Sequence, residues 1–230
     1  MKQILVSLAI LLVFSCTDSK EKNSTNEQEQ TKEKTTGPKR LNLDSLQKVK
    51  IAIHNSRLDF RKIDSLFKFS QVKTIDKKIK FDIKEYNRLS AEDFFQAFQD
   101  SAQYYYDPEF SAAYYYSNQG EWNGFKRYIF VVIDDACCEY YYYTIYDTSG
   151  KLTDFFIIEK KGVELSWEII GTAKFPNDST IIKATNDCDA SYEGNTRIED
   201  CDSTVVVYHL LKNGKVRSTK EFGKRTKTKK

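Results

Sequence analysis

The sequence contains few of the residues on which common catalytic and metal sites depend. Among its 230 residues there are only two histidines, His54 in a helical pattern and His209 in a strand pattern. We interpret both as structural or surface residues. The alternative is that His209 activates Cys137 or Cys138, but oxidation on export would more often consume those thiols. The motifs G-x-S-x-G, H-E-x-x-H and G-x-G-x-x-G and the P-loop are absent. We therefore predict no catalytic residue and no cofactor.

Long apolar runs are also scarce, because only Ile4 to Phe14 forms one. This run follows the positive charge of Lys2 and is shorter than the roughly 20 residues that span a bilayer. Val13-Phe14-Ser15-Cys16 closes the run and resembles the lipobox of bacterial lipoproteins. The resemblance implies that residues 1–15 are a signal peptide and that Cys16 carries acyl chains. The alternatives are an ordinary secretory signal with a chance cysteine, or an N-terminal membrane anchor.

The stretch from Thr17 to Arg40 has no aliphatic residue. Such a segment cannot bury apolar surface, so we expect residues 16–40 to be the lipidated cysteine and a disordered tether. We expect residues 41–223 to form a single domain and residues 224–230 to be a basic, disordered tail.

Four cysteines remain once Cys16 is acylated, and an exported chain with an even number of cysteines indicates disulfides. Cys188 and Cys201 flank a polar loop between two predicted strands. If those strands pair antiparallel, the two cysteines face each other, so we predict a Cys188–Cys201 disulfide. The adjacent Cys137 and Cys138 are left open as a vicinal disulfide or as two thiols.

The apolar periodicity predicts an α+β fold. Leu41–Ser70 has a helical pattern, and Ser90 followed by Asp93 predicts a capped helix that ends near Ser101. Ile79–Ile83 alternates like a strand. Together these features predict a helical N-terminal layer on an antiparallel β-sheet or meander of about seven strands. The seven strands are expected at 128–133, 140–146, 152–159, 164–175, 179–185, 205–211 and 216–222.

Charge is unevenly distributed along the chain. Residues 41–84 contain 11 basic and 5 acidic residues, whereas residues 134–202 contain 6 basic and 15 acidic ones. The acidic half argues against a nucleic-acid partner. Asp187-x-Asp189 opens like a calcium-binding loop, but Tyr192 occupies the position of the turn glycine and Ile198 that of the final glutamate. We therefore predict no metal site and interpret these acidic residues as a solvated hairpin tip.

The tyrosines are the remaining conspicuous feature. Side chains alternate along a strand, so two of the four residues Tyr140–Tyr143 are expected to face outward. Tyr141 and Tyr143, with Trp122, are candidates for an aromatic face that binds a sugar or a protein partner. The alternative is that these rings pack against helices or a second sheet.

The lipobox, the polar tether and the hairpin sequences YDTSGKLTDFF and YHLLKNGKV together resemble small Bacteroidota lipoproteins of unknown function. The resemblance implies a protein of the cell envelope, lipid-anchored at the outer membrane, whose partners are the membrane and an envelope protein or glycan. We expect a non-catalytic binding or interaction role. The alternatives are an inhibitor or immunity-type lipoprotein that acts on a toxin or protease, and a carboxylate-dependent hydrolase.

Overall fold

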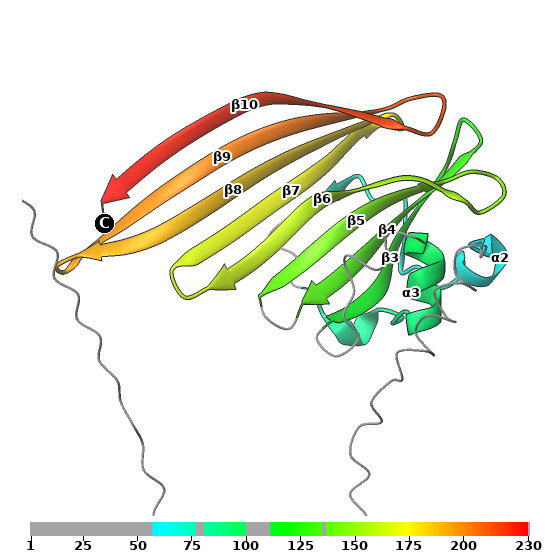
Figure 1. Ribbon diagram of the computed structural model, residues 1–230, viewed down its shortest axis with the longest axis horizontal. Helices are drawn as coiled ribbons and strands as arrows, with labels where there is room; N and C mark the ends of the chain where they lie inside the picture. Colours follow the sequence, from blue (N-terminus) through cyan, green and yellow to red (C-terminus); the bar gives the residue numbers. More distant parts are fainter. Residues whose placement is uncertain (1–56, 77–80, 100–110, 135–136, 230) are drawn as a thin grey trace, which may run out of the picture. The chain divides into compact units, whose positions relative to one another are not determined.

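A computed structural model describes residues 57–76, 81–99, 111–134 and 137–229 of the chain. These residues form one ten-stranded sheet in the order β1-β3-β4-β5-β6-β7-β8-β9-β10, and β2 pairs with β7 outside this path (Figure 1). The strands are β1 (Phe69–Ser70), β2 (Thr74–Ile75), β3 (Ser111–Trp122), β4 (Phe125–Asp134), β5 (Cys138–Tyr146), β6 (Leu152–Glu164), β7 (Trp167–Asn177), β8 (Thr180–Glu193), β9 (Thr196–Leu210) and β10 (Val216–Lys229). The helical segments are α2 (Phe60–Ile63), the 3-10 helix η1 (Ile83–Glu85) and α3 (Ala91–Phe98).

The predicted α+β fold with a helical N-terminal layer is wrong. In the described part of that region, α2 has four residues and α3 has eight. The same region contributes β1, which pairs in parallel with β3 and makes the sheet mixed. The strand predicted at Ile79–Ile83 is not found in its described part, where Ile83 begins η1. Residues 41–56 of the predicted helical region lie outside the described residues.

The apolar pattern before residue 76 has a different cause from the one we inferred. Leu66 and Phe67 pack with the cluster on one face of the sheet, whereas Phe69 and Val72 pack with the cluster on the other face. The apolar residues are therefore spaced as they are because the chain passes from one face of the sheet to the other. They do not form one face of a helix.

The seven predicted strands are confirmed as β4 to β10, and each pairs antiparallel with its neighbour in sequence. The prediction missed β3, whose pairing with β4 contains two register shifts and whose sequence turns polar at Ser117–Gly120. The predicted disordered tail also needs correction, because residues 224–229 belong to β10 and pair with β9.

Both faces of β3, β4 and β5 are covered. On one face, Phe94, Ala97 and Phe98 of α3 pack against rings of the sheet such as Phe130 and Tyr142, as the position of α3 in Figure 1 also indicates. Ser90 caps α3 as predicted, since its hydroxyl accepts a hydrogen bond from the Asp93 backbone N–H at 3.0 Å.

The other face of β3–β5 buries a second cluster. The segment that contains β1, β2 and η1 covers it and contributes Ile75, Phe81 and Tyr86. The later strands contribute Phe175 from β7 and Ile181 from β8. This second core therefore joins the first half of the sheet, β3–β6, to the second half, β7–β10.

Direct strand pairing between the two halves is limited. β6 and β7 pair over four residues each, Lys161–Glu164 with Trp167–Ile170. Beyond that point β2 takes the place of β6 beside β7, at Lys174 and Ala173. The halves therefore depend on other contacts where β6 and β7 have separated.

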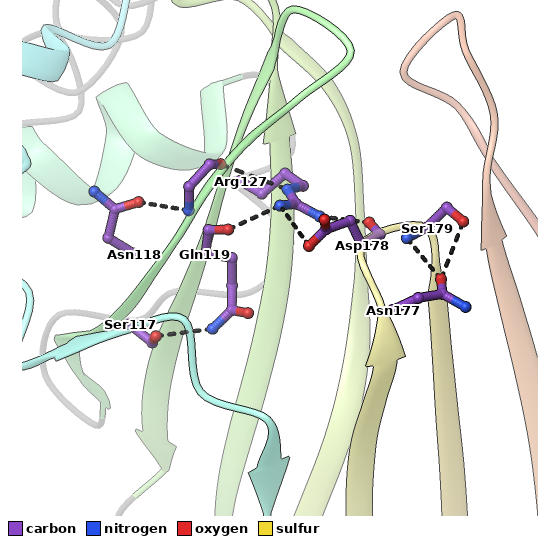
Figure 2. A network of polar contacts seen from close by, with 8 residues as sticks. Ser117, Asn118, Gln119, Arg127, Asn177, Asp178 and Ser179 are labelled. Carbon is purple, nitrogen blue, oxygen red and sulfur yellow. Dashed lines mark hydrogen bonds and ion pairs between the residues drawn. The ribbon is translucent and has the colours of Figure 1, made fainter.

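Arg127 on β4 supplies such a contact (Figure 2). Its guanidinium is almost fully buried, at 5% exposure, and donates to the backbone carbonyls of Gln119 at 2.8 Å, Gly120 at 3.5 Å and Asp178. The Asp178 carboxylate also lies 3.7 Å from the guanidinium. Arg127 thus ties the β3–β4 hairpin in the first half to the β7–β8 turn in the second.

We predict that Arg127→Met lowers the free energy of unfolding by about 3 kcal/mol, because it leaves buried carbonyls without a charged donor. Urea titration of both proteins measures the change. Arg217→Met removes the same group at an exposed position of β10 and should change stability by no more than about 0.5 kcal/mol. A loss at Arg127 as small as that control would contradict the role assigned to this side chain.

Candidate functional site

A groove lies on β7, β8 and β9 and has a volume of about 270 Å³. Ala173 and Ile181 on these strands point into the second core. Side chains alternate along a strand, so Thr172 on β7 faces the opposite way from Ala173, toward the groove. The groove is lined by Glu168, Ile170, Thr172, Ala184, Thr185, Asn186, Cys188, Ser203, Thr204 and Val205.

The lining combines hydroxyl and amide groups with small apolar side chains. Ser203 donates a hydrogen bond from its hydroxyl to the Asn186 side-chain oxygen. Among these described lining residues Glu168 is the single side chain that ionises, since Cys188 is in a disulfide. Such a surface can hydrogen-bond and pack against a ligand, whereas acid–base catalysis requires a positioned proton donor and acceptor.

The aromatic face predicted at Trp122, Tyr141 and Tyr143 does not form. Tyr141 and Tyr143 are 4% and 1% exposed in the second core, and Trp122 is half-buried against the same cluster. Tyr142, between them, is equally buried in the first core. Successive tyrosine side chains of β5 point alternately into the two cores, so none of these three faces solvent. The prediction failed because it assumed that one face of this strand is exposed.

The structure contains the Cys188–Cys201 disulfide, and it also joins Cys137 to Cys138. The surroundings of the Cys188–Cys201 disulfide differ from the polar loop that we predicted. Cys188 and Cys201 are a directly opposed cross-strand pair, and β8 and β9 continue beyond them to a two-residue turn at Gly194-Asn195. The segment between the cysteines is therefore a paired hairpin and not a polar loop that depends on a crosslink for order.

An aspartate flanks each of these cysteines on both sides. Asp187 lies opposite Asp202, and Asp189 lies opposite Asp200. Like charges opposite each other destabilise a sheet, so these carboxylates need partners. The side chain of Arg225 on β10 binds both oxygens of Asp200, at 2.9 and 2.7 Å.

Two further contacts stabilise carboxylates of the acidic hairpin formed by β8 and β9. The indole N–H of Trp167 donates to Asp187 at 2.7 Å, and Lys229 on β10 pairs with Glu193 at 3.2 Å. The hydrogen bond from Arg225 lowers the pKa of Asp200. The sequence analysis interpreted these acidic residues as a solvated hairpin tip and residues 224–230 as a disordered tail. In the structure, Arg225 and Lys229 of β10 partly neutralise the acidic residues.

A second group of charged side chains is buried or half-buried near the place where β6 leaves β7. Glu159 on β6 is 1% exposed, and its Oε2 has no hydrogen-bond partner among the described residues. The ammonium group of Lys183 on β8 donates to the Ile157 carbonyl at 3.2 Å. Lys161 Nζ lies 3.8 Å from Glu139 Oε2. The sequence analysis did not single out any of these residues, because their burial depends on strand pairing distant in sequence.

Burial raises the pKa of Glu159 to about 8, and the negative charges of Glu139 and Asp76 add to the effect against the opposing influence of Lys161 and Lys183. Burial also raises the pKa of Glu139 and lowers that of Lys183. Perturbed carboxyl groups are typical of catalytic sites, but they also occur in buried structural networks. At 1% exposure Glu159 cannot reach a substrate in this conformation, so we interpret the group as structural.

Within the described residues, no group of three or more histidine, cysteine or acidic side chains is placed to hold a metal ion. Nor does any helix of that part have the length and apolar character needed to cross a bilayer. Comparisons of the chain with protein-family models, curated proteins and solved structures gave no match.

The raised pKa of Glu159 makes stability depend on pH. The folded protein holds this proton up to about pH 8, whereas the unfolded chain releases it near the ordinary glutamate pKa of 4.5. The protonated Glu159 therefore favours the folded state at low pH, and this contribution is lost as the pH rises from about 5 to about 8. We predict that Glu159→Gln makes the free energy of unfolding fall less steeply with pH over this range.

Urea titrations at pH 5, 7 and 9 test this. Glu164→Gln is the matched control, because Glu164 is an exposed glutamate on the same strand. It should retain the pH dependence of the parent protein. If Glu159→Gln and Glu164→Gln have the same pH dependence, the carboxyl of Glu159 is not the group responsible.

Proposed function

We propose that this chain is a lipid-anchored protein of the cell envelope, with a non-catalytic binding role. Acylated Cys16 holds it at the outer membrane, and residues 17–40 link the anchor to the folded body. The groove on β7–β9 is the surface on which an envelope protein or glycan binds. As the sequence resemblance implies, the chain belongs with the small Bacteroidota-type lipoproteins.

The lipobox Val13-Phe14-Ser15-Cys16 supports the anchor, although these residues lie outside those that the structure describes. The Cys137–Cys138 and Cys188–Cys201 disulfides support export, because disulfides persist in oxidising compartments and are rare in the cytosol.

The groove carries the binding part of the proposal. Its floor is a stretch of sheet whose opposite side is fixed by the second core through Ala173 and Ile181. Binding surfaces on rigid elements lose little conformational entropy when a partner docks. Hydroxyl and amide groups such as those of Thr172, Asn186 and Ser203 offer hydrogen bonds to a polar partner.

The two alternatives have less support. An inhibitor that meets a basic target through the acidic half needs free carboxylates, but Asp200 and Glu193 pair with Arg225 and Lys229 of the same chain. A carboxylate-dependent hydrolase needs its carboxyl groups at a substrate, and Glu159 is buried. We therefore retain the binding role.

Cys16→Ser tests the anchor. Without the thiol no acyl chain can attach, so we predict that incorporation of labelled palmitate is lost and that the protein moves from the membrane fraction to the soluble fraction. Cys188→Ser/Cys201→Ser is the control for a general effect of cysteine loss, and it should remain acylated. Labelled palmitate on Cys16→Ser would show that the lipobox assignment is wrong.

A photo-crosslinking residue at Asn186 tests the binding surface, because this position is exposed and lines the groove. We predict a discrete crosslinked species in intact cells from Asn186 and none from the exposed turn position Lys151. Mass spectrometry of the adduct identifies the partner. Equal crosslinking from both positions, or none from either, would remove the support for the groove.

A further inference from the structure

The last strand of the sheet carries several basic residues, on both of its faces, that the proposed binding role does not use. β10 is the terminal strand in the sheet order, as Figure 1 shows. We define the basic strip as the exposed residues Lys212, Lys215, Arg217, Lys220 and Lys224, which lie on the β9–β10 turn and on β10.

The strip differs from the C-terminal end of the same strand. There, Arg225 and Lys229 pair with Asp200 and Glu193 of the acidic hairpin. Among the described side chains, no carboxylate lies within ion-pair distance of the strip residues. Lys215 donates to the Thr153 carbonyl, but no ion pair with a described carboxylate offsets the positive charge of the strip.

The length of the strip restricts the kind of ligand that fits it. A strand rises about 3.3 Å per residue, so Lys215 and Lys224 lie roughly 30 Å apart. A small anion cannot contact residues over that distance, whereas an extended anionic surface can. The proposed acyl anchor places the chain at a bilayer, which favours a surface of lipid phosphates over a nucleic acid.

We propose that the basic strip docks the folded body onto the anionic headgroups of the membrane that holds the acyl anchor. The inference rests on the proposed lipid anchor. A flexible chain of 24 residues, the length of the tether expected at residues 17–40, has a mean span of roughly 27 Å and would keep the body close to the bilayer. One acyl anchor combined with a basic patch gives firmer attachment than either signal alone.

Lysine footprinting on the full-length acylated protein tests this docking. The protein is reconstituted into vesicles of phosphatidylcholine alone, or of phosphatidylcholine with phosphatidylglycerol, and treated with a water-soluble amine reagent. We predict several-fold slower labelling of Lys212, Lys215, Lys220 and Lys224 in the anionic vesicles, reversed by high salt. The exposed controls Lys151 and Lys174 should be labelled at equal rates in both.

A charge-reversed variant, Lys215→Glu/Arg217→Glu/Lys220→Glu, should lose the protection of Lys212 and Lys224, whereas Lys151→Glu/Lys174→Glu should retain it. Equal labelling of the strip lysines in both kinds of vesicle would overturn the proposal, and this comparison requires no variant. Stronger protection by an oligonucleotide at the same phosphate concentration would make the strip a nucleic-acid surface and would also overturn it.

Flotation of the same samples separates this inference from the proposed anchor. Failure to float with the vesicles of phosphatidylcholine alone would show that the chain is not anchored. Protection of the strip lysines in the anionic vesicles would still support the docking surface in that case, because labelling reports contact with the headgroups directly.

Discussion

The buried guanidinium of Arg127 is the contact on which the arrangement of the sheet depends most. β6 and β7 pair over only four residues each, so the two halves of the sheet have little backbone pairing in common. Arg127 joins them by donating to carbonyls of Gln119 and Gly120 in one half and of Asp178 in the other (Figure 2). Because a buried charge without partners is costly, its hydrogen bonds favour one relative position of the halves.

The two halves serve different purposes in this account. β3–β5 bury tyrosine and phenylalanine rings on both faces and supply most of the apolar packing. β7–β9 bury side chains such as Ala173 and Ile181 on one face and carry the groove on the other. β10 neutralises the acidic hairpin with Arg225 and Lys229 and continues as the basic strip. The well-packed half thus provides a rigid support for the half that carries the proposed contact surfaces.

Local features of this fold were predictable from the sequence, and long-range ones were not. Ser90 caps α3, the strands from β4 to β10 are present, and Cys188 pairs with Cys201, because each follows from short-range patterns or from neighbouring strands. Tyr141 and Tyr143 were wrongly placed on an outer face, since covering segments arrive from Phe69–Tyr86. The extension of β10 was missed because Arg225 and Lys229, two of its basic residues, are compensated by carboxylates on β9 and β8. The location of the groove required the register of β7, β8 and β9, which the sequence does not give.

Hydrogen exchange under native conditions, measured at increasing denaturant, tests most directly whether the two halves are one cooperative unit. If Arg127 and the second core couple them, backbone amides of Ile129–Val131 on β4 and of Ala173–Phe175 on β7 exchange only through global unfolding. The two groups then report the same free energy of opening. The account would be contradicted if the amides of β7 and its neighbours opened as a separate unit, at a clearly lower free energy, while those of β4 stayed protected.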